Sequence, residues 1–203
     1  MVRTPRFKAW FGDWEQSNQS PVKAIILTGS EIGGQTPKEA RTDAKKFVGN
    51  LIRALLEKTG TDTLLNERTG FKIRLLEKGV THGFQHKGAE HVKAVAAIKQ
   101  LIEGSAKIAT RAHEPLSDDS SKVHTLVAPL SIDGDWFAVK LTVKESWDGK
   151  MRLYDHQALR MNKPDGISES TPESTGSIHR PASGSVVTIG HLLSAFKGEP
   201  CPT

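Results

Sequence analysis

Two neighbouring predicted strands carry basic, phenolic and imidazole side chains at alternating positions. Lys140 and Lys144 occupy the first strand, four residues apart. Arg152, Tyr154 and His156 occupy the second, each two residues from the next. Because side chains of a β-strand alternate between the two faces of a sheet, we expect each set to share one face. Cations, a phenol and an imidazole on one surface can bind a phosphate and transfer protons around it.

Cleavage of RNA without a metal ion requires three kinds of group. A base removes the proton of the 2′-hydroxyl, an acid protonates the departing 5′-oxygen, and positive charge stabilises the phosphorane-like transition state. Histidine suits both proton transfers, since its ordinary pKa of about 6.5 lies near neutral pH. Further histidines lie before and at the start of the predicted sheet: His82, His86, His113 and His124. These residue types favour metal-independent phosphodiester chemistry.

Several of these residues also have a purely structural interpretation. His124 alternates with Val123 and Thr125, as a half-buried strand residue does. Lys144 lies near the end of its strand, where a charge protects a sheet edge or simply meets solvent. Lys140 differs, because it interrupts the apolar run WFAVKLTV. Functional and structural interpretations therefore both stay open for the lysines and for His124.

Metal and nucleophile motifs receive little support from the sequence. His82, His86 and His91 lie within ten positions, but Gly83 and Gly88 oppose the continuous helix that would bring two of them onto one face. No cysteine is nearby, and no Walker loop or GxSxG motif is present. We expect neither a metal nor a cofactor.

The composition favours a folded chain with an anionic partner. The chain has 203 residues, a formal net charge of +5 and a pI of about 9.3. This balance mildly favours nucleic acid as a partner. The only cysteine, Cys201, allows no internal disulfide, which suits a reducing compartment. We find no membrane-spanning run and no signal peptide, and we expect a cytoplasmic protein or one delivered into a target cell's cytoplasm.

Helices and strands alternate irregularly along the chain. Thr36 as N-cap, Pro37 at the first turn and Glu39 three residues after the cap predict a helix that ends before Gly60. A second helix is expected from about residue 89 to residue 103. Strands are expected at 23–28, in a hairpin over 63–76, at 106–112, in three consecutive segments over 123–161, and at 185–189; a last short helix is expected over 191–196. Asp-Gly pairs separate the three consecutive strands, as hairpin turns do.

This order predicts an α+β fold in which helices pack on an antiparallel sheet of four or more strands. We expect residues 1–60 to form an N-terminal extension, in which an aromatic-rich leader precedes a strand and a helix. Residues 61–203 would then form the main domain. Its segment 167–184 is rich in Ser, Thr, Pro and Gly, and we expect a flexible insertion there.

Several runs of the sequence resemble a known group of proteins. The opening FKAWFGDWE resembles the leader of many phage-encoded large polyvalent proteins. The runs KIRLLEKGVTH, QLIEGSAKI, VHTLVAPLSIDGDWFAVKLTVKE and MRLYDHQAL resemble their predicted nuclease domains, of the barnase, EndoU, colicin and RelE-like (BECR) group. The resemblance is best over residues 71–161. It implies a four-stranded antiparallel sheet whose exposed face carries a metal-independent RNA-cleaving site, often in a toxin.

The resemblance also implies site residues. His82 corresponds to the histidine after the KG turn, and Tyr154 with His156 corresponds to a tyrosine-x-histidine pattern near the third strand. We expect His82 or His156 to act as base and acid, Lys140 and Arg152 to stabilise the phosphate, and Tyr154 to orient it. The expected catalytic set is His82, Lys140, Tyr154 and His156, and the expected substrate-binding set is Arg152, His86, Lys144 and His124.

These expectations lead to two hypotheses for function. The first is an endoribonuclease toxin or effector domain that cleaves RNA, such as tRNA, by attack of the 2′-hydroxyl to give a cyclic phosphate. An acidic immunity protein or antitoxin would then cover its basic face. The second is a non-catalytic module of a phage or mobile-element polypeptide that binds nucleic acid or another protein.

Overall fold

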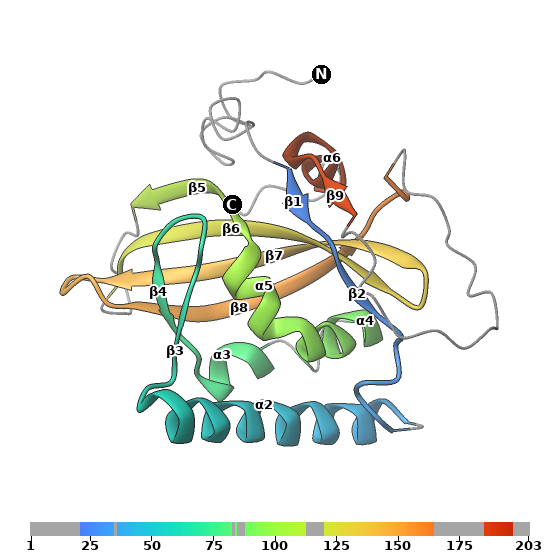
Figure 1. Ribbon diagram of the computed structural model, residues 1–203, viewed down its shortest axis with the longest axis horizontal. Helices are drawn as coiled ribbons and strands as arrows, with labels where there is room; N and C mark the ends of the chain where they lie inside the picture. Colours follow the sequence, from blue (N-terminus) through green and yellow to red (C-terminus); the bar gives the residue numbers. More distant parts are fainter. Residues whose placement is uncertain are drawn as a thin grey trace.

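A curled sheet of seven strands forms the body of the molecule (Figure 1). The computed structural model describes residues 21–34, 36–82, 84, 88–112, 120–164 and 185–196. The strands run in the order β2-β6-β7-β8-β4-β3. β2 pairs with the last residues of β6, and β5 pairs with an earlier part of β6. The aromatic leader, most of the acidic loop before β6, the 167–184 segment, His86, His113 and Cys201 lie outside the described residues.

Three long antiparallel strands occupy the centre of the sheet. They are β6 (Ser120–Ile132), β7 (Asp135–Ser146) and β8 (Met151–Arg160). The β6–β7 turn contains Asp133 and Gly134 with φ of 52° and 81°, and Gly149 in the β7–β8 turn has φ of 79°. Tight hairpin turns require a positive φ, and Gly, Asn and Asp adopt a positive φ most readily. The three predicted strands and their Asp-Gly turns are confirmed.

The strands on either side of this centre make the sheet mixed rather than antiparallel. β2 (Ile25–Leu27) pairs in parallel with the end of β6, and β4 (Lys72–Arg74) pairs in parallel with the start of β8. β3 (Thr63–Leu65) joins β4 as the predicted hairpin, and β5 (Ala106–Ala112) is antiparallel to β6. Elements on both sides of residue 60 therefore belong to one sheet.

The long helix α2 (Pro37–Thr59) follows the sequence prediction closely. The Thr36 side chain accepts a hydrogen bond from the backbone N–H of Glu39, whose carboxylate accepts one from the backbone N–H of Thr36. This reciprocal capping box satisfies two donors that the helix leaves open. Gly60, with φ of 70°, ends the helix in the left-handed conformation.

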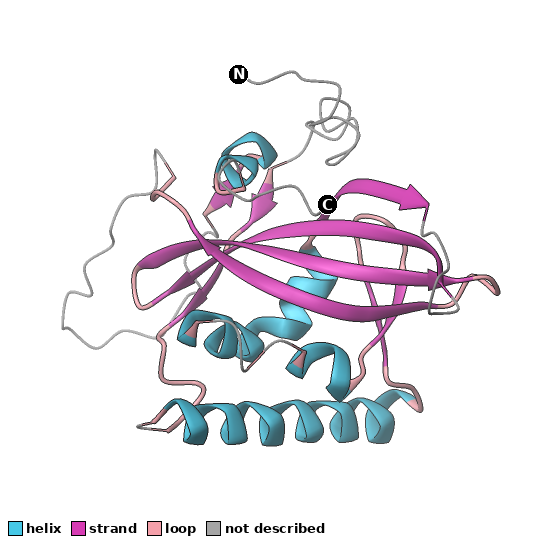
Figure 2. Ribbon diagram, turned by 180° about the vertical axis from the view of Figure 1, so that it is seen from behind, coloured by secondary structure: helices cyan, strands magenta, loops and turns pink. Residues whose placement is uncertain are grey.

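Short helices fill the space between α2 and the sheet (Figure 2). They are α3 (Glu77–Thr81), α4 (Ala89–Lys93), the 3-10 turn η1 (Ala94–Ala97) and α5 (Ile98–Gly104). The single helix predicted over 89–103 is thus broken into three pieces. Buried apolar residues of these pieces, of α2 and of the sheet form one core.

A smaller unit lies on the side of the sheet opposite to α2 and the short helices (Figure 1). It consists of β1 (Val22–Lys23), β9 (Val186–Val187) and α6 (Ile189–Ser194), and α6 packs against β6. The strand predicted over 23–28 is divided between β1 and β2 at Ala24, whose backbone N–H donates to the carbonyl of Ser185. No helix in the described part of the chain is long and apolar enough to cross a membrane.

Candidate functional site

A β-bulge in β8 decides where the predicted site residues point. Thr142 is opposite Asp155, but Val143 is opposite Leu153, so Tyr154 has no partner in the register. The bulge changes which residues share a face. Arg152 lies opposite Lys144, whereas His156 lies opposite Leu141 on the face that the short helices cover. The expectation that Arg152, Tyr154 and His156 share one face is wrong, because that expectation assumed uninterrupted alternation.

His82 and Tyr154 meet at the edge of β8. His82 follows α3, and its ring centroid is 5.0 Å from that of Tyr154. Its Nδ1 is 3.6 Å from Oδ1 of Asp155. The His82 side chain is 47% exposed and Tyr154 is 39% exposed. An imidazole beside a carboxylate and a phenol, all accessible to solvent, can exchange protons with a bound ligand.

One cation lies against Tyr154, and a second lies opposite the first on the neighbouring strand. The Nζ of Lys144 is 3.9 Å from the centroid of the Tyr154 ring, which is cation–π geometry. Lys144 and Arg152 are opposite each other on β7 and β8, and Nη2 of Arg152 donates to Oγ of Ser120 at 3.4 Å. The structure therefore brings together four of the predicted residues: His82, Lys144, Arg152 and Tyr154.

His156 does not join them at the surface. It is fully buried, and its Nε2 donates to the backbone carbonyl of His91 at 3.0 Å. Its ring stacks on that of His91, with centroids 3.9 Å apart and planes 14° from parallel. The Phe84 ring lies nearly perpendicular to both imidazoles. An imidazole in this position has no direct access to an external substrate.

Lys140 and His124 belong to other surroundings. Lys140 is opposite Gln157, and its Nζ lies 5.9 Å from the centroid of the Phe196 ring, beside the small unit that contains α6. His124 Nε2 is 2.7 Å from Oε2 of Glu145, and its Nδ1 is 2.9 Å from the hydroxyl of Thr110.

A basic surface pocket adjoins the His82–Tyr154 edge through Arg152. The pocket has a volume of about 440 Å³ and is lined by residues from β4, β8 and the β7–β8 turn. Arg74, Lys150 and Arg152 contribute cations, although Asp62 and Asp148 pair with the first two. Trp147 is 71% exposed at its rim. The sequence reasoning missed Trp147 and Arg74; a lone tryptophan in a turn between two basic strands was the available signal.

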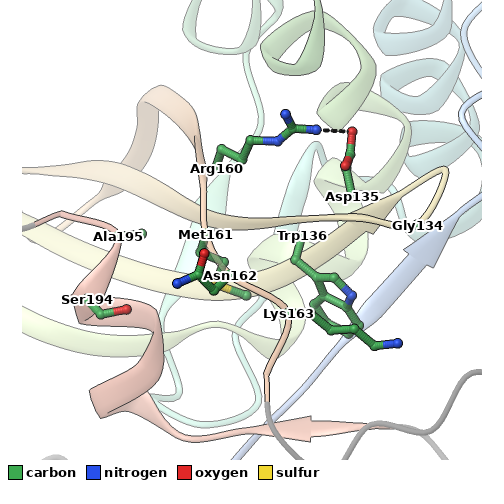
Figure 3. A pocket seen from close by; sticks show the side chains of 9 residues that line it. All are labelled: Gly134, Asp135, Trp136, Arg160, Met161, Asn162, Lys163, Ser194 and Ala195. Carbon is green, nitrogen blue, oxygen red and sulfur yellow. Dashed lines mark ion pairs between the residues drawn. The ribbon is translucent and has the colours of Figure 1, made fainter.

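A second pocket lies at the opposite end of β7 and β8 (Figure 3). Its volume is about 580 Å³, and Trp136, Met161 and Lys163 help to line it. Figure 3 shows the guanidinium of Arg160 directed at the carboxylate of Asp135, with which it forms an ion pair. None of the histidines that the structure describes lines this pocket, so proton-transfer chemistry is better supported at the His82 edge.

A comparison with protein families gives a match over a long central part of the chain. Residues 35–154 match the family described as large polyvalent protein-associated domain 3. The chain belongs to this family. The family match covers α2 through the start of β8, as far as Tyr154, and it includes His82, Lys144, Arg152 and Tyr154. No curated protein and no solved structure matches the chain.

Proposed function

We propose that this protein is an RNA-cleaving module of a large polyvalent protein, encoded by a phage or a related mobile element. The observation that carries the proposal is the contact series at the β8 edge, where His82 adjoins Tyr154 and Tyr154 adjoins Lys144. This edge offers an exposed imidazole and a partly exposed phenol, with the largely buried ammonium of Lys144 against the phenol ring. The phosphodiester chemistry expected from the sequence needs these groups and no metal in the reaction.

His82 is the general base of the proposed reaction. Its imidazole accepts the proton of the 2′-hydroxyl while that oxygen attacks the adjacent phosphorus. The bond from phosphorus to the 5′-oxygen breaks, and a 2′,3′-cyclic phosphate forms. Asp155, 3.6 Å from Nδ1 of His82, stabilises the imidazolium that results. The hydroxyl of Tyr154 donates the proton that the departing 5′-oxygen requires.

Lys144 and Arg152 supply the positive charge. They lie opposite each other on adjacent strands, and Lys144 contacts the Tyr154 ring. Cations aimed at a phosphate stabilise the charge that accumulates on its oxygens in the transition state. Lys144 takes the place of Lys140 beside Arg152 in that role, and His82 with Tyr154 replaces the buried His156 in proton transfer.

The adjacent pocket would hold the rest of the RNA strand. Trp147 presents an exposed ring on which a base can stack, and base–aromatic stacking is worth about 1–3 kcal/mol per base. Arg74, Lys150 and Arg152 line the same pocket and can follow the phosphate backbone. An extended RNA strand that crosses this pocket would reach the Tyr154 edge through Arg152.

The test is an RNA cleavage assay with matched variants. Purified protein is incubated with total RNA in the presence of EDTA, and circular dichroism under the same conditions verifies the fold. The variants are His82→Ala and Tyr154→Phe, and the control is His191→Ala. The partly exposed ring of His191 donates a hydrogen bond to the backbone carbonyl of Asn162 and is not part of the candidate site. We expect His82→Ala and Tyr154→Phe each to lower the rate by roughly 10²–10⁴-fold, and His191→Ala to leave it unchanged. No cleavage by the folded wild type, or equal rates in all variants, would refute catalysis.

The basic pocket also favours a second candidate, RNA binding without cleavage. Trp147 and three cations form a binding surface that needs no proton transfer. Binding would weaken as salt rises, because each neutralised phosphate releases counterions. Fluorescence anisotropy with a labelled single-stranded RNA distinguishes the two functions. Salt-dependent binding that Trp147→Ala weakens, together with intact RNA and unimpaired growth of expressing cells, would establish the binding module.

A further inference from the structure

We propose that His91, Asp155 and His156 bind a divalent transition-metal ion of the Zn²⁺ class beneath the β8 edge. Each residue offers one ligand atom, and the three atoms lie within 4.8 Å of one another. Two imidazoles and a carboxylate form a donor set that Zn²⁺ and its neighbours in the periodic table favour. The ion would be a structural clamp and takes no part in the proposed RNA chemistry.

The burial of the two histidines is the first argument. His156 is 0% exposed and His91 is 2% exposed, while the Asp155 side chain is 19% exposed. Burying polar groups in an apolar core is unfavourable unless they are satisfied by hydrogen bonds or by an ion. The partly exposed Asp155 also gives an ion a path into the site from solvent.

The tautomer of His156 is the second argument. A backbone carbonyl can only accept a hydrogen bond, so the contact with the carbonyl of His91 places the proton on Nε2 of His156. Neutral His156 therefore carries its lone pair on Nδ1. A ligating histidine that donates its other N–H to a carbonyl is the usual arrangement around protein-bound metals. His156 is thus already in the form that an ion requires.

The surroundings of the cluster support a closed site. Phe84 lies edge-on to His91 and His156, at 5.8 Å and 6.5 Å between centroids, and is itself buried. The two imidazoles are nearly parallel, so their rings must tilt for both lone pairs to converge on one ion. Both side chains must therefore rotate out of the stacked arrangement when the ion binds, and water completes the coordination of an ion that three protein ligands hold.

Such an ion would join two elements that are far apart in the sequence. His91 lies on α4, which has only five residues, and Asp155 and His156 lie on β8. A short helix has little stability of its own, so a bond to the sheet would fix its position. Asp155 is also 3.6 Å from His82, so the clamp would hold the carboxylate that adjoins the proposed base.

The experiment measures metal binding without RNA, so its failure leaves the proposed nuclease untouched. The untagged chain with Cys201→Ser, which removes its only thiol, is stripped with a chelator and titrated with Zn²⁺ by calorimetry. Co²⁺ is added separately, and its visible absorption reports the ligands. We expect one ion per chain, a rise in the melting temperature with Zn²⁺, and a cobalt spectrum typical of nitrogen and oxygen ligands.

Variants distinguish this site from accidental binding. Asp155→Asn replaces a partly exposed ligand by an isosteric group, so it should fold, and we expect it to weaken Zn²⁺ binding by roughly 10–100-fold. His91→Gln should do the same, and His191→Ala on α6 should have no effect. The inference is overturned if the stripped chain binds no Zn²⁺, or if Asp155→Asn binds it as tightly as the parent. In the first case the stacked imidazoles are only a packing arrangement.

Discussion

Burial of His124 favours the neutral form of its imidazole. Burial lowers its pKa from the ordinary 6.5, and the nearby charges of Lys107 and Lys122 act in the same direction, although Glu145 opposes them. The carboxylate of Glu145 can only accept, so Nε2 of His124 donates to it, and the Thr110 hydroxyl donates to Nδ1. The hydrogen bond from His124 lowers the pKa of the Glu145 carboxyl below its ordinary 4.5. The network links β5, β6 and β7.

The lowered pKa of His124 predicts a loss of stability in mild acid. As pH falls through 6.5, His124 of the unfolded chain binds a proton while His124 of the folded chain does not. The free energy of unfolding therefore decreases until the pH falls below the lower pKa of His124 in the folded chain. Glu145 adds a loss of the same sign below pH 4.5. Urea unfolding at pH 7.5, 6.5 and 5.5 measures the first effect. In His124→Gln we expect a smaller decrease between pH 6.5 and 5.5, and an identical decrease would show that other groups cause it.

At the scale of elements, α3 packs directly on the backbone of β8. A Cβ built on Gly79 would lie 2.0 Å from the carbonyl oxygen of Leu153, which no atom can approach so closely. This contact places the end of α3, and with it His82, beside Tyr154. Glycine at this position therefore determines the geometry of the candidate site.

Alanine at Gly79 should disturb this packing. Alanine favours helices by about 1 kcal/mol over glycine, but the clash outweighs that gain, and we expect Gly79→Ala to destabilise the fold by about 1–3 kcal/mol. Gly49→Ala, in the middle of α2 with no atom within 4 Å of its Cβ, is the matched control. We expect it to stabilise by about 0.5–1 kcal/mol. Thermal unfolding compares them; two stabilised variants would rule out the close contact.

Local signals in the sequence predicted most elements but not their details. The capping box and Gly60 delimit α2 because both act within a few residues. The break at Ala97, with φ of −97° and ψ of 4°, had no such signal, since the alanines around it favour a continuous helix. The bulge at Tyr154 was also hidden, because alternation of residue types does not reveal an extra residue within a strand.

The candidate site was predicted only in part, because residue types can be read from the sequence but the packing of distant elements cannot. Its residue types were recognisable, and Lys144, Arg152, Tyr154 and His82 do come together. His156 was misplaced, because positions after the bulge change face. His91 could not be linked with His156 from the sequence, since their stacking depends on how α4 lies against β8. Long-range packing, unlike hairpin turns, leaves no short sequence signature.

At the scale of the whole molecule, the first described segments are integral to the core. β2 extends the sheet beside β6, and α2 packs against α3, α4 and η1. Ala44, Val48 and Leu55 are the buried residues of α2. The proposed division of the chain at residue 60 stays a prediction, and these contacts make it testable.

A fragment that begins at residue 61 should fold poorly. Losing the burial of several apolar side chains costs about 1.5–3 kcal/mol for each large one, and a domain has only about 5–15 kcal/mol of stability in total. We therefore expect the 61–203 fragment to lack a cooperative thermal transition under conditions where the whole chain has one. Differential scanning calorimetry of both chains is the measurement. A fragment that melts at the same temperature as the whole chain would establish an independent domain.

The unpaired position of Tyr154 also affects how relatives of this protein should be aligned. If Tyr154 were absent, Leu153 and Asp155 would be adjacent and would keep their present partners, Val143 and Thr142. A family member one residue shorter here would keep its whole strand in register, and its alignment would show a single-column gap in the middle of β8. Such a gap ordinarily suggests an alignment error. Here it would mark the gain or loss of one tyrosine during evolution, without any change in the rest of the sheet.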